Sequence, residues 1–405
     1  MPPVRLLELR TTYKWGGGPD KTILLSASRH DPQRVSVVVA YVRGAHDYEF
    51  AIADKARALG LTFYEIEERG KFDLRVLGAI RDIIIEHDIN LIHAHDYKTD
   101  LFAYIVRALL RRRALSLLST AHGWALLGTR GELYRRLDLF LLRRFDHVLA
   151  VSHATKNGLT SAGIPPTSIS VLHNAIDTET WSPSRGHPGY QEGWGSVSYF
   201  PIIGYVGRIT PEKDLHTWLR VAALVAQQFP HARFVLVGDG KDEVLLKELQ
   251  HQVGALGIAK QVVFHGYQES PLNSYRTFDI FLLTSTTEGL SNSLLEAMAM
   301  GLPTVVTRVG GNEELVADGH TGYVLSAGDV HGLAQAIITL AQNEQLRRAM
   351  GQAGRERIEH AFSFIHRLQR IESLYEHLVG AQSTVISSPS TAVLSSSSST
   401  TFGNK

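Results

Sequence analysis

PIIGYVGRITPEKDLHTWLRVAALVAQQF, residues 201–229, contains one complete strand–loop–helix unit. Its first residues are apolar and partly β-branched, as expected of a buried strand. Later apolar residues, including Leu215, Trp218 and Ala222, recur at intervals of three and four, which is the period of an amphipathic helix. A strand followed at once by such a helix is the building block of a parallel sheet covered by helices.

The same unit recurs along both halves of the chain. Short β-rich segments in the first half lie at residues 4–9, 35–41, 61–66, 90–95, 114–120, 147–152 and 168–174. Those in the second half lie at residues 201–209, 232–238, 261–266, 279–285, 302–307 and 322–326. Stretches of helical period separate them. The sequence therefore predicts an α/β fold of two doubly wound, Rossmann-like domains that face each other across a cleft.

The boundaries of these units follow from changes in composition. We assign residues 1–185 to the N-terminal domain, the Gly-, Pro- and Ser-rich residues 186–200 to a linker, and residues 201–362 to the C-terminal domain. Residues 363–380 are predicted to form a final amphipathic helix. The Ser- and Thr-rich residues 381–405 are predicted to be disordered.

Composition and charge narrow the classes of function. The chain has 405 residues, of which 44% are hydrophobic and 20% charged, and its net charge is +1, so we expect a globular protein that does not bind nucleic acid. The absence of cysteine excludes disulfides, thiolate zinc sites and a cysteine nucleophile, and fits a reducing compartment. We find no apolar run long enough for a signal peptide or a membrane span. A cytoplasmic protein is therefore expected, with peripheral contact at the inner face of the membrane as a further expectation.

Two glutamates, Glu288 and Glu296, flank the stretch GLSNSLL. Ser291 or Asn292 is predicted to begin a helix there, and the free N–H groups of that helix would form a site for a phosphate. The two Cα atoms are expected to be about 10–15 Å apart, too far for an acid–base pair but suitable for gripping hydroxyls on either side of a pyrophosphate. A nucleotide sugar has this layout. Ordinary surface charges are the alternative interpretation.

Two cations, Arg208 and Lys213, lie in the loop of the unit quoted first. They could neutralise the charge that builds up on a departing diphosphate. An ordinary pair of surface charges is the alternative for this loop as well.

Together with these residues, the segments GRITPEKDL, VLVGDG, VVFHGY and EGLSNSLLEAMAMGLPTVVTRVGGNEELVADGHTGYVL resemble the family 4 glycosyltransferases, which have the GT-B fold. The similarity runs in order over residues 203–340. It implies that the C-terminal domain binds a nucleotide sugar and the N-terminal domain binds the acceptor. It also implies retention of anomeric configuration, with the leaving phosphate accepting the proton of the acceptor.

The resemblance assigns roles residue by residue. Arg208 and Lys213 would contact the donor diphosphate. Glu288 would contact the transferred sugar, and Glu296 the ribose. The expected catalytic residues are His122, Arg208, Lys213 and Glu288. The expected donor-binding residues are Gly16, Gly17, Arg208, Lys213, Gly238, Glu288, Ser291, Asn292, Leu295 and Glu296.

Four of these residues come from glycine-rich or histidine-containing loops. Gly16 and Gly17 match the glycine-rich loop that the family uses near the diphosphate and the acceptor, although a flexible loop is an alternative. His122, in STAHGW after a predicted strand, matches a histidine that contacts the donor sugar. Gly238 belongs to VLVGDG.

Metal and cofactor sites are not expected. The segment LVGDGKDE has no third glycine, which disfavours a nicotinamide enzyme, and the chain has no Asp-x-Asp triplet for a metal-bound diphosphate. His93 and His95 in HAHD have a spacing that could bind a metal, but a metal site is the less favoured interpretation. The expected co-substrate is a UDP-sugar or a GDP-sugar.

Residues 107–144 are strongly basic. They could rest on anionic lipid, or they could form a core-packed helix with a solvated basic face, and we leave both interpretations open. The segment contains Arg107, Arg111, Arg112, Arg113, Arg130, Arg135, Arg136, Arg143 and Arg144.

The sequence therefore predicts a metal-independent, retaining glycosyltransferase of the hexosyltransferase type. Its acceptor would be a glycan or a lipid-linked molecule in polysaccharide or glycolipid biosynthesis. The alternatives are a sugar-nucleotide epimerase or hydrolase of the same fold, or a non-catalytic protein that binds nucleotide sugars.

Overall fold

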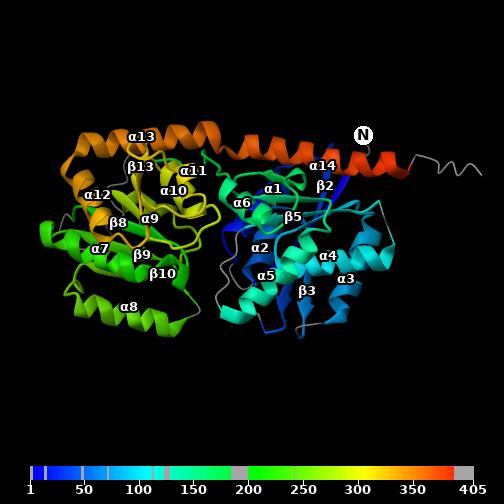
Figure 1. Cartoon of the computed structure of the whole chain (residues 1–405), viewed down its shortest axis with the longest axis horizontal. Coiled ribbons are helices and arrows are strands. Elements are labelled where there is room, and N and C mark those ends of the chain that lie inside the picture. The colour runs from blue at the N-terminus through cyan, green and yellow to red at the C-terminus, as the bar shows by residue number, and fades with distance from the viewer. Residues whose placement is uncertain are drawn as a thin grey trace, which may run out of the picture.

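Two lobes lie side by side in the computed structural model, and each is built around one sheet (Figure 1). The structure describes residues 3–12, 16–46, 50–70, 73–111, 114–122, 128–183, 199–240 and 242–386.

The first lobe contains a seven-stranded parallel sheet with the order β3-β2-β1-β4-β5-β6-β7. Its strands are β1 (Val4–Thr11), β2 (Val35–Gly44), β3 (Thr62–Glu68), β4 (Leu91–Ala94), β5 (Ser116–Ala121), β6 (His147–Ala150) and β7 (Ile169–Val171). Each overlaps one predicted segment. Some strands stop earlier than predicted, as β4 does at Ala94, because the polar residues that follow turn out of the sheet into the loop.

The second lobe contains a six-stranded parallel sheet with the order β10-β9-β8-β11-β12-β13. Its strands are β8 (Ile202–Val206), β9 (Arg233–Val237), β10 (Val262–Gly266), β11 (Ile280–Leu283), β12 (Thr304–Thr307) and β13 (Gly322–Leu325). Each again overlaps a predicted segment, so the predicted alternation of strands and helices is confirmed in both halves.

Helices cover both faces of the first sheet. One face packs against α3 (Leu74–Glu86), α4 (Tyr97–Leu110), α5 (Gly128–Leu142) and α6 (His153–Ser161). The other face packs against α1 (Gly18–Arg29), α2 (Ala51–Ala58) and α14 (Phe364–Ile386). Because the central strands are buried on both sides, they are nearly continuous runs of apolar residues, as in other parallel sheets.

One hydrophobic core holds the second lobe together. Its centre is the fully buried Trp218, whose indole N–H donates to the Leu282 carbonyl at 3.3 Å. The helices of this lobe are α7 (Leu215–Gln228), α8 (Glu243–Ala255), α9 (Leu272–Thr277), α10 (Asn292–Ala299), α11 (Asn312–Leu315), α12 (Val330–Gln342) and α13 (Glu344–Ala361). Two short 3₁₀ helices, η1 (Pro166–Ser168) and η2 (Pro211–Lys213), lie in loops of the first and second lobes.

Strand order reverses between β1 and β4 in the first sheet and between β8 and β11 in the second. In open parallel sheets, ligands bind beyond the carboxyl ends of the strands at such a reversal. The loops that follow β1, β4, β8 and β11 are therefore the places to look for a site.

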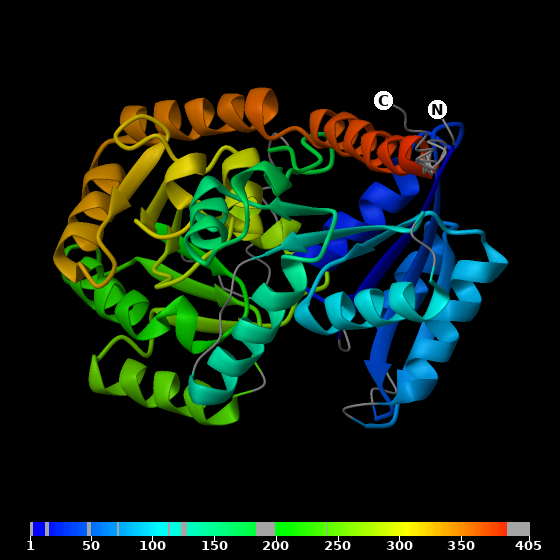
Figure 2. The same cartoon turned by 45° about the vertical axis from the view of Figure 1, so that its right-hand side comes forward.

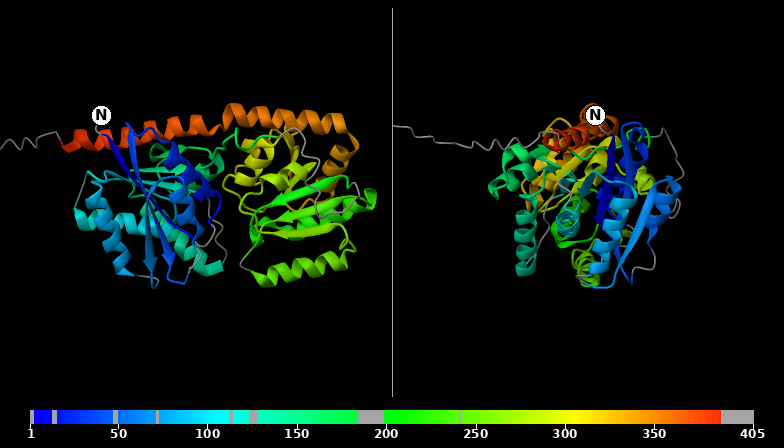
Figure 3. Two further views of the ribbon diagram at one scale, coloured as in Figure 1. Left: turned by 180° about the vertical axis from the view of Figure 1, so that it is seen from behind. Right: turned by 90° about the vertical axis from the view of Figure 1, so that its right-hand side faces the viewer.

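The last helix returns from the second lobe to the first. α13 lies along the second lobe and α14 along the first, in line with each other, as Figures 2 and 3 show from several sides. Arg34 anchors α14 through Glu372 at 2.7 Å and Glu376 at 2.8 Å. α14 runs on to Ile386, past the predicted end at residue 380, because residues 381–386 contain neither glycine nor proline.

The boundaries of the domains stay predictions. Most of the predicted linker (186–198) and residues 387–405 of the predicted tail lie outside the described residues. Among the helices that the structure describes, none has the length and apolarity needed to cross a bilayer.

Replacement of Ile371 by alanine is expected to lower the free energy of unfolding by about 2–5 kcal/mol, because Ile371 is 1% exposed in the contact between α14 and the first sheet. Ile365 on the same helix is 60% exposed, and Ile365→Ala should change stability by less than about 0.5 kcal/mol. Urea denaturation of both variants tests this, and equal losses would contradict the docking of α14.

Candidate functional site

Two loops of the second lobe are joined where the strand order reverses. The Thr284 hydroxyl, just after β11, donates to the carbonyls of Lys213 and Asp214 at 3.0 Å each, and these residues follow β8. The backbone N–H of Thr286 donates to the Glu212 carbonyl at 2.8 Å. The predicted diphosphate-binding loop and the loop that carries Glu288 therefore form one unit.

Lys213 and Glu288 form the most buried charge pair of this unit. The Lys213 Nζ atom is 2.6 Å from Glu288 Oε1, and the side chains are 14% and 8% exposed. Ser285 donates to the same carboxylate oxygen at 2.7 Å. Arg208 lies beside them, 3.5 Å from Glu212, with a side chain that is 58% exposed. The structure thus leaves Arg208 open to a ligand, while Lys213 and Glu288 hold each other in place.

Close backbone contacts shape this unit and require glycine. Gly238, predicted to bind the donor, has φ +132°, and a Cβ atom there would lie 1.9 Å from the Gly207 carbonyl oxygen. Gly310 has φ +53°, and its Cβ would lie 1.9 Å from the Glu288 carbonyl oxygen. A side chain at either position would push these loops apart. The sequence analysis missed Gly310, although two consecutive glycines soon after a predicted strand were an available signal.

Glu296 lies one turn into α10. The helix begins after Ser291, whose hydroxyl accepts from the Leu294 N–H at 3.3 Å, so the predicted start is confirmed. The buried Glu296 carboxylate accepts from Lys21 Nζ at 3.0 Å and from the Tyr275 hydroxyl at 2.9 Å. Burial and the Glu296 charge both raise the pKa of Tyr275 well above its ordinary value, so the phenol stays a donor.

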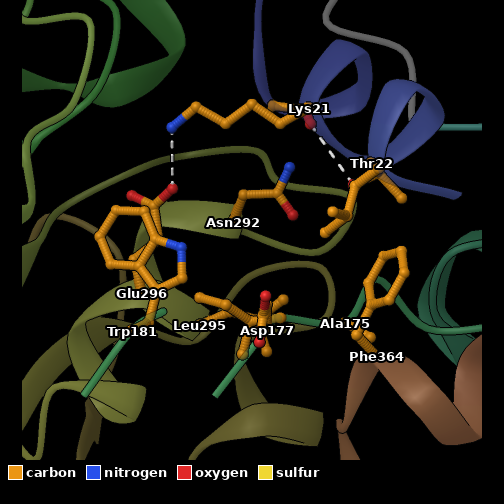
Figure 4. Close-up of a pocket in the computed structure, with 12 residues that line it drawn as sticks. Lys21, Thr22, Ala175, Asp177, Trp181, Asn292, Leu295, Glu296 and Phe364 are labelled. Carbon is orange, nitrogen blue, oxygen red and sulfur yellow. Dashed lines mark hydrogen bonds and ion pairs between the residues drawn. The ribbon is translucent and has the colours of Figure 1, made fainter. Parts of the chain in front are cut away.

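A pocket opens between the lobes at Glu296. In Figure 4, Lys21 extends from α1 toward Glu296, with Asn292 and Trp181 beside them. Lys21 Nζ also lies 5.6 Å from the centre of the Trp181 ring. The lining residues are Gly18, Lys21, Thr22, Leu25, Ala175, Ile176, Asp177, Trp181, Asn292, Leu295, Glu296 and Phe364.

The first turns of α1 and α10 meet in this pocket. A Cβ atom on Gly18 would lie 2.2 Å from Asn292 Nδ2, so a larger residue there would force the Asn292 side chain to move. Two helix N-termini and the Lys21 cation therefore converge on one place, which favours an anion. The preceding loop holds Gly16 at φ +72°, and the Gly17 N–H donates to Asp20 at 2.5 Å.

His122 directly follows β5, and its backbone carbonyl faces the second lobe. A Cβ atom on Gly289 would lie 2.2 Å from the His122 carbonyl oxygen, so His122 adjoins the loop that carries Glu288. Its Nε2 atom lies 3.4 Å from His95 Nδ1. Burial, and then the charge of Arg10, lower the pKa of His122 well below its ordinary value, so its imidazole is neutral at pH 7.

The structure brings the predicted residues together in two groups. Glu288 is grouped with Lys213, Arg208 and, across the lobes, His122. Glu296 is grouped with Asn292 and Leu295, close to the loop of Gly16 and Gly17. Gly238 instead packs against Gly207, so its position is explained by the packing of one loop on another. The contributions of Lys21, Trp181 and Tyr275 were missed. Lys21 closely follows the glycine-rich loop but was not singled out, and no local pattern indicates that these side chains meet at Glu296.

Within the part of the chain that the structure describes, two groups of side chains have atoms spaced for a metal. Glu8, His93 and His95 have possible ligand atoms within 4.8 Å of one another, and so do His153, His173 and Glu314. In the second group the Glu314 carboxylate already accepts from His173 Nε2 at 2.7 Å and from the backbone N–H groups of His153 and Ala154, at the first turn of α6. This contact joins α11 of the second lobe to the first lobe.

Comparison with known proteins identifies the family. Residues 17–180 match the family model described as Glycosyltransferase Family 4, and residues 190–357 match that of the glycosyl transferases group 1. Over 287 residues the chain is 30% identical to the GDP-mannose-dependent alpha-(1-6)-phosphatidylinositol monomannoside mannosyltransferase of Mycolicibacterium smegmatis, which spans 65% of this chain and 72% of that protein. The chain belongs to glycosyltransferase family 4.

Further relatives agree with this assignment. The family 4 glycosyltransferase described here is 28% identical over 316 residues to the N-acetyl-alpha-D-glucosaminyl L-malate synthase of Bacillus anthracis, covering 77% of this chain and 80% of that protein. HepE of Anabaena, solved in complex with UDP-glucose, superposes with a TM-score of 0.80 at 22% identity over 92% of this chain and 99% of that one. The predicted family, GT-B fold and transferase class are confirmed.

Stability is expected to fall as the pH is lowered from 7 to 4. Burial, and then the neighbouring His93, lower the pKa of His95 to about 3, whereas an unfolded histidine has a pKa of about 6.5. The unfolded chain therefore binds a proton over this range that the folded chain does not, which favours unfolding. Burial raises the pKa of Glu8, but the opposing effect of His93 and His95 is larger, so the pKa lies well below its ordinary value. Glu8 therefore also makes the folded state less stable as the pH falls.

Urea denaturation at several pH values measures this slope. His95→Gln should flatten it, whereas the same change at the exposed His331 should not. Equal slopes for wild type and His95→Gln would contradict the assignment of a neutral, buried His95.

Proposed function

We propose that this glycosyltransferase transfers a hexosyl group with retention from a nucleoside-diphosphate sugar to a glycan or lipid-linked acceptor, in polysaccharide or glycolipid biosynthesis. The observation that carries the proposal is the convergence of the first turns of α1 and α10 between two carboxylates, each of which is paired with a lysine. A diphosphate fits the positive helix ends, and sugar hydroxyls fit the carboxylates on either side.

In this proposal the ribose binds at Glu296 and the transferred sugar at Glu288. Lys21 and the Tyr275 hydroxyl now satisfy Glu296, so a ribose hydroxyl would share the carboxylate with them or replace Lys21. The Lys21 side chain is 53% exposed, which leaves it free to turn toward the neighbouring phosphates. Gly16, Gly17, Ser291, Asn292 and Leu295 would line the donor.

The chemistry needs charge stabilisation more than a nucleophile. Negative charge builds up on the diphosphate as the glycosidic bond breaks, and Arg208 and Lys213 can stabilise it. The N–H groups at the start of α10 would act in the same direction. The leaving phosphate would accept the proton of the acceptor, and His122 would contact the donor sugar. These protein cations support a reaction that runs without a metal.

The comparisons support two candidate donors. HepE is described in complex with UDP-glucose, and the mycobacterial relative is described as GDP-mannose-dependent. A thermal-shift screen with UDP, GDP, ADP and their sugars, in the presence of EDTA, would identify the nucleotide, since a ligand that binds only the folded state raises the melting temperature.

Glu296→Gln is expected to weaken binding of that nucleotide by about tenfold or more, because a buried charged hydrogen-bond acceptor for the ribose is lost. Glu288→Gln should leave nucleotide binding nearly unchanged and abolish transfer. Calorimetric titration and product analysis measure the two effects. Glu356→Gln, at an exposed position of α13, is the matched control. Wild-type behaviour of both site variants would contradict the proposed donor orientation.

A peripheral contact with membrane lipid is proposed for α5. Its outer face exposes Leu133 (67%), Phe140 (47%) and Leu137 (37%), while Leu139 and Leu142 are buried against the sheet. A helix with apolar residues on both faces has a surplus of apolar surface that lipid can cover.

Only some of the nine predicted arginines are available to lipid. Arg107 pairs with Asp146 at 2.7 Å and Arg135 with Glu132 at 2.8 Å. Arg136 also lies 3.1 Å from Glu132, but its side chain is 74% exposed. Arg112 and Arg113 lie outside the described residues, as does the side chain of Arg130. Among the described arginines, fewer are therefore available to lipid than the sequence suggests, and Arg136 lies on α5, which also carries the exposed apolar face.

Leu133→Ser is expected to weaken binding to vesicles that contain anionic phosphatidylglycerol several-fold, because one exposed leucine contributes roughly 1–2 kcal/mol of transfer free energy. Val244→Ser on α8 of the second lobe is the matched control, since Val244 is 66% exposed. Co-sedimentation measures the bound fraction, and equal binding of the two variants would exclude α5 as the contact.

A further inference from the structure

Behind His122 lies a buried network that spans three neighbouring strands. Glu8 is on β1, His95 follows β4 and His122 follows β5, and these strands are adjacent in the first sheet. Glu8 is 2% exposed and His95 is 5% exposed. A carboxylate is costly to bury unless several donors surround it, so its position here calls for an explanation.

Hydrogen bonds connect Glu8 to His122 through the ring of His95. Glu8 Oε2 lies 2.5 Å from His95 Nε2, and Glu8 Oε1 accepts from the Tyr375 hydroxyl at 3.2 Å. On the other side of the His95 ring, Nδ1 lies 3.4 Å from His122 Nε2. The two rings stack with centroids 5.7 Å apart and an interplanar angle of 27°. The hydrogen bond between His95 and His122 is the longest of the three, and it is the one that would shorten when a ligand orders His122.

The protonation of the network follows from burial and from the donor inventory. Burial lowers the pKa of His95 to about 3 and that of His122 well below its ordinary value, so both rings are neutral at pH 7. An ionised carboxylate only accepts hydrogen bonds, so His95 must carry its proton on Nε2 and leave Nδ1 as an acceptor. His122 then donates through Nε2, and its Nδ1 is left with a lone pair.

We propose that Glu8 and His95 are positioning residues that select the tautomer of His122, so that His122 Nδ1 accepts a hydrogen bond from a hydroxyl of the transferred sugar. Neither residue touches the substrate. The identity of the group that His122 contacts rests on the proposed function, whereas the selection of the tautomer rests only on the network itself. Buried partners that fix a histidine tautomer in this way are common where the other ring nitrogen has a task.

Tyr375 provides an internal control. It comes from α14, and its hydroxyl contacts Glu8 and His93, on a branch of the network that continues from His93 Nε2 to the Thr120 hydroxyl at 2.7 Å and not to the His122 ring. Removing the Tyr375 hydroxyl should therefore leave the His122 tautomer unchanged, although it removes a hydrogen bond to the same carboxylate. If the network had a purely structural role, loss of the Tyr375 hydroxyl and loss of His95 would affect the His122 tautomer alike.

The test is the protonation state of each ring nitrogen, measured by ¹⁵N NMR of the full chain with labelled histidine. In the wild type, His95 and His122 are both expected to be protonated on Nε2 only. His95→Leu should give a mixture of His122 tautomers, and Tyr375→Phe should not. His95→Gln should restore the wild-type His122 signal, because an amide can donate to Glu8 and accept from His122. If His95→Leu does not fold, Glu8→Gln replaces it.

A His122 ring protonated on Nδ1 in the wild type, or one that is unchanged in His95→Leu, would overturn the proposal. Transfer is measured separately, with UDP-glucose and GDP-mannose as the donors. The turnover number of His95→Leu should fall by roughly tenfold, which is at the low end for the loss of a positioned catalytic contact. His95→Gln should recover most of the wild-type turnover number. Failure of the proposed function would appear differently, as wild-type transfer by His122→Ala with the NMR result intact.

Discussion

The parallel direction of every strand is the constraint on which the rest of this structure depends. Parallel strands gather all their carboxyl ends at one edge of a sheet, and each sheet here reverses its order once, at β1/β4 and at β8/β11. His95, Lys213 and Glu288 lie in the loops at those reversals, and Glu8 lies within β1, a few residues before its loop. Because the two lobes meet at these edges, residues more than 200 positions apart in sequence, such as Lys21 and Glu296, come into contact.

Charges in the cleft are held in pairs. Glu288 is paired with Lys213 from its own lobe, and Glu296 with Lys21 from the other lobe. Pairing lowers the cost of keeping carboxylates in partly buried positions and keeps them oriented for a ligand. The interlobe pair also ties Glu296, the carboxylate proposed to bind the ribose, to the first lobe. Exchange of Lys21 for a sugar hydroxyl would therefore couple ligand binding to the contact between the lobes.

Much of the fold could be predicted because the relevant signals are local. Apolar runs of strand length and helical periods are properties of a few neighbouring residues, and every predicted strand is present. The start of α10 at Ser291 was predictable for the same reason. Gly238 shows the limit of this approach. The resemblance assigned Gly238 to the donor site, which stays a prediction, but no local pattern indicated that its backbone packs against the Gly207 carbonyl from another loop.

The sequence by itself determined the order of strands and helices, the family, and the set of charged residues after β8 and β11. It could do so because each is recorded in short contiguous segments. Only the tertiary structure decided that Tyr275 and Lys21 share Glu296, that Gly18 admits Asn292, and that Glu8 lies behind His122 through His95. These contacts join segments with no common motif, and whether they form depends on how sheets and lobes pack, which no local pattern of residues specifies.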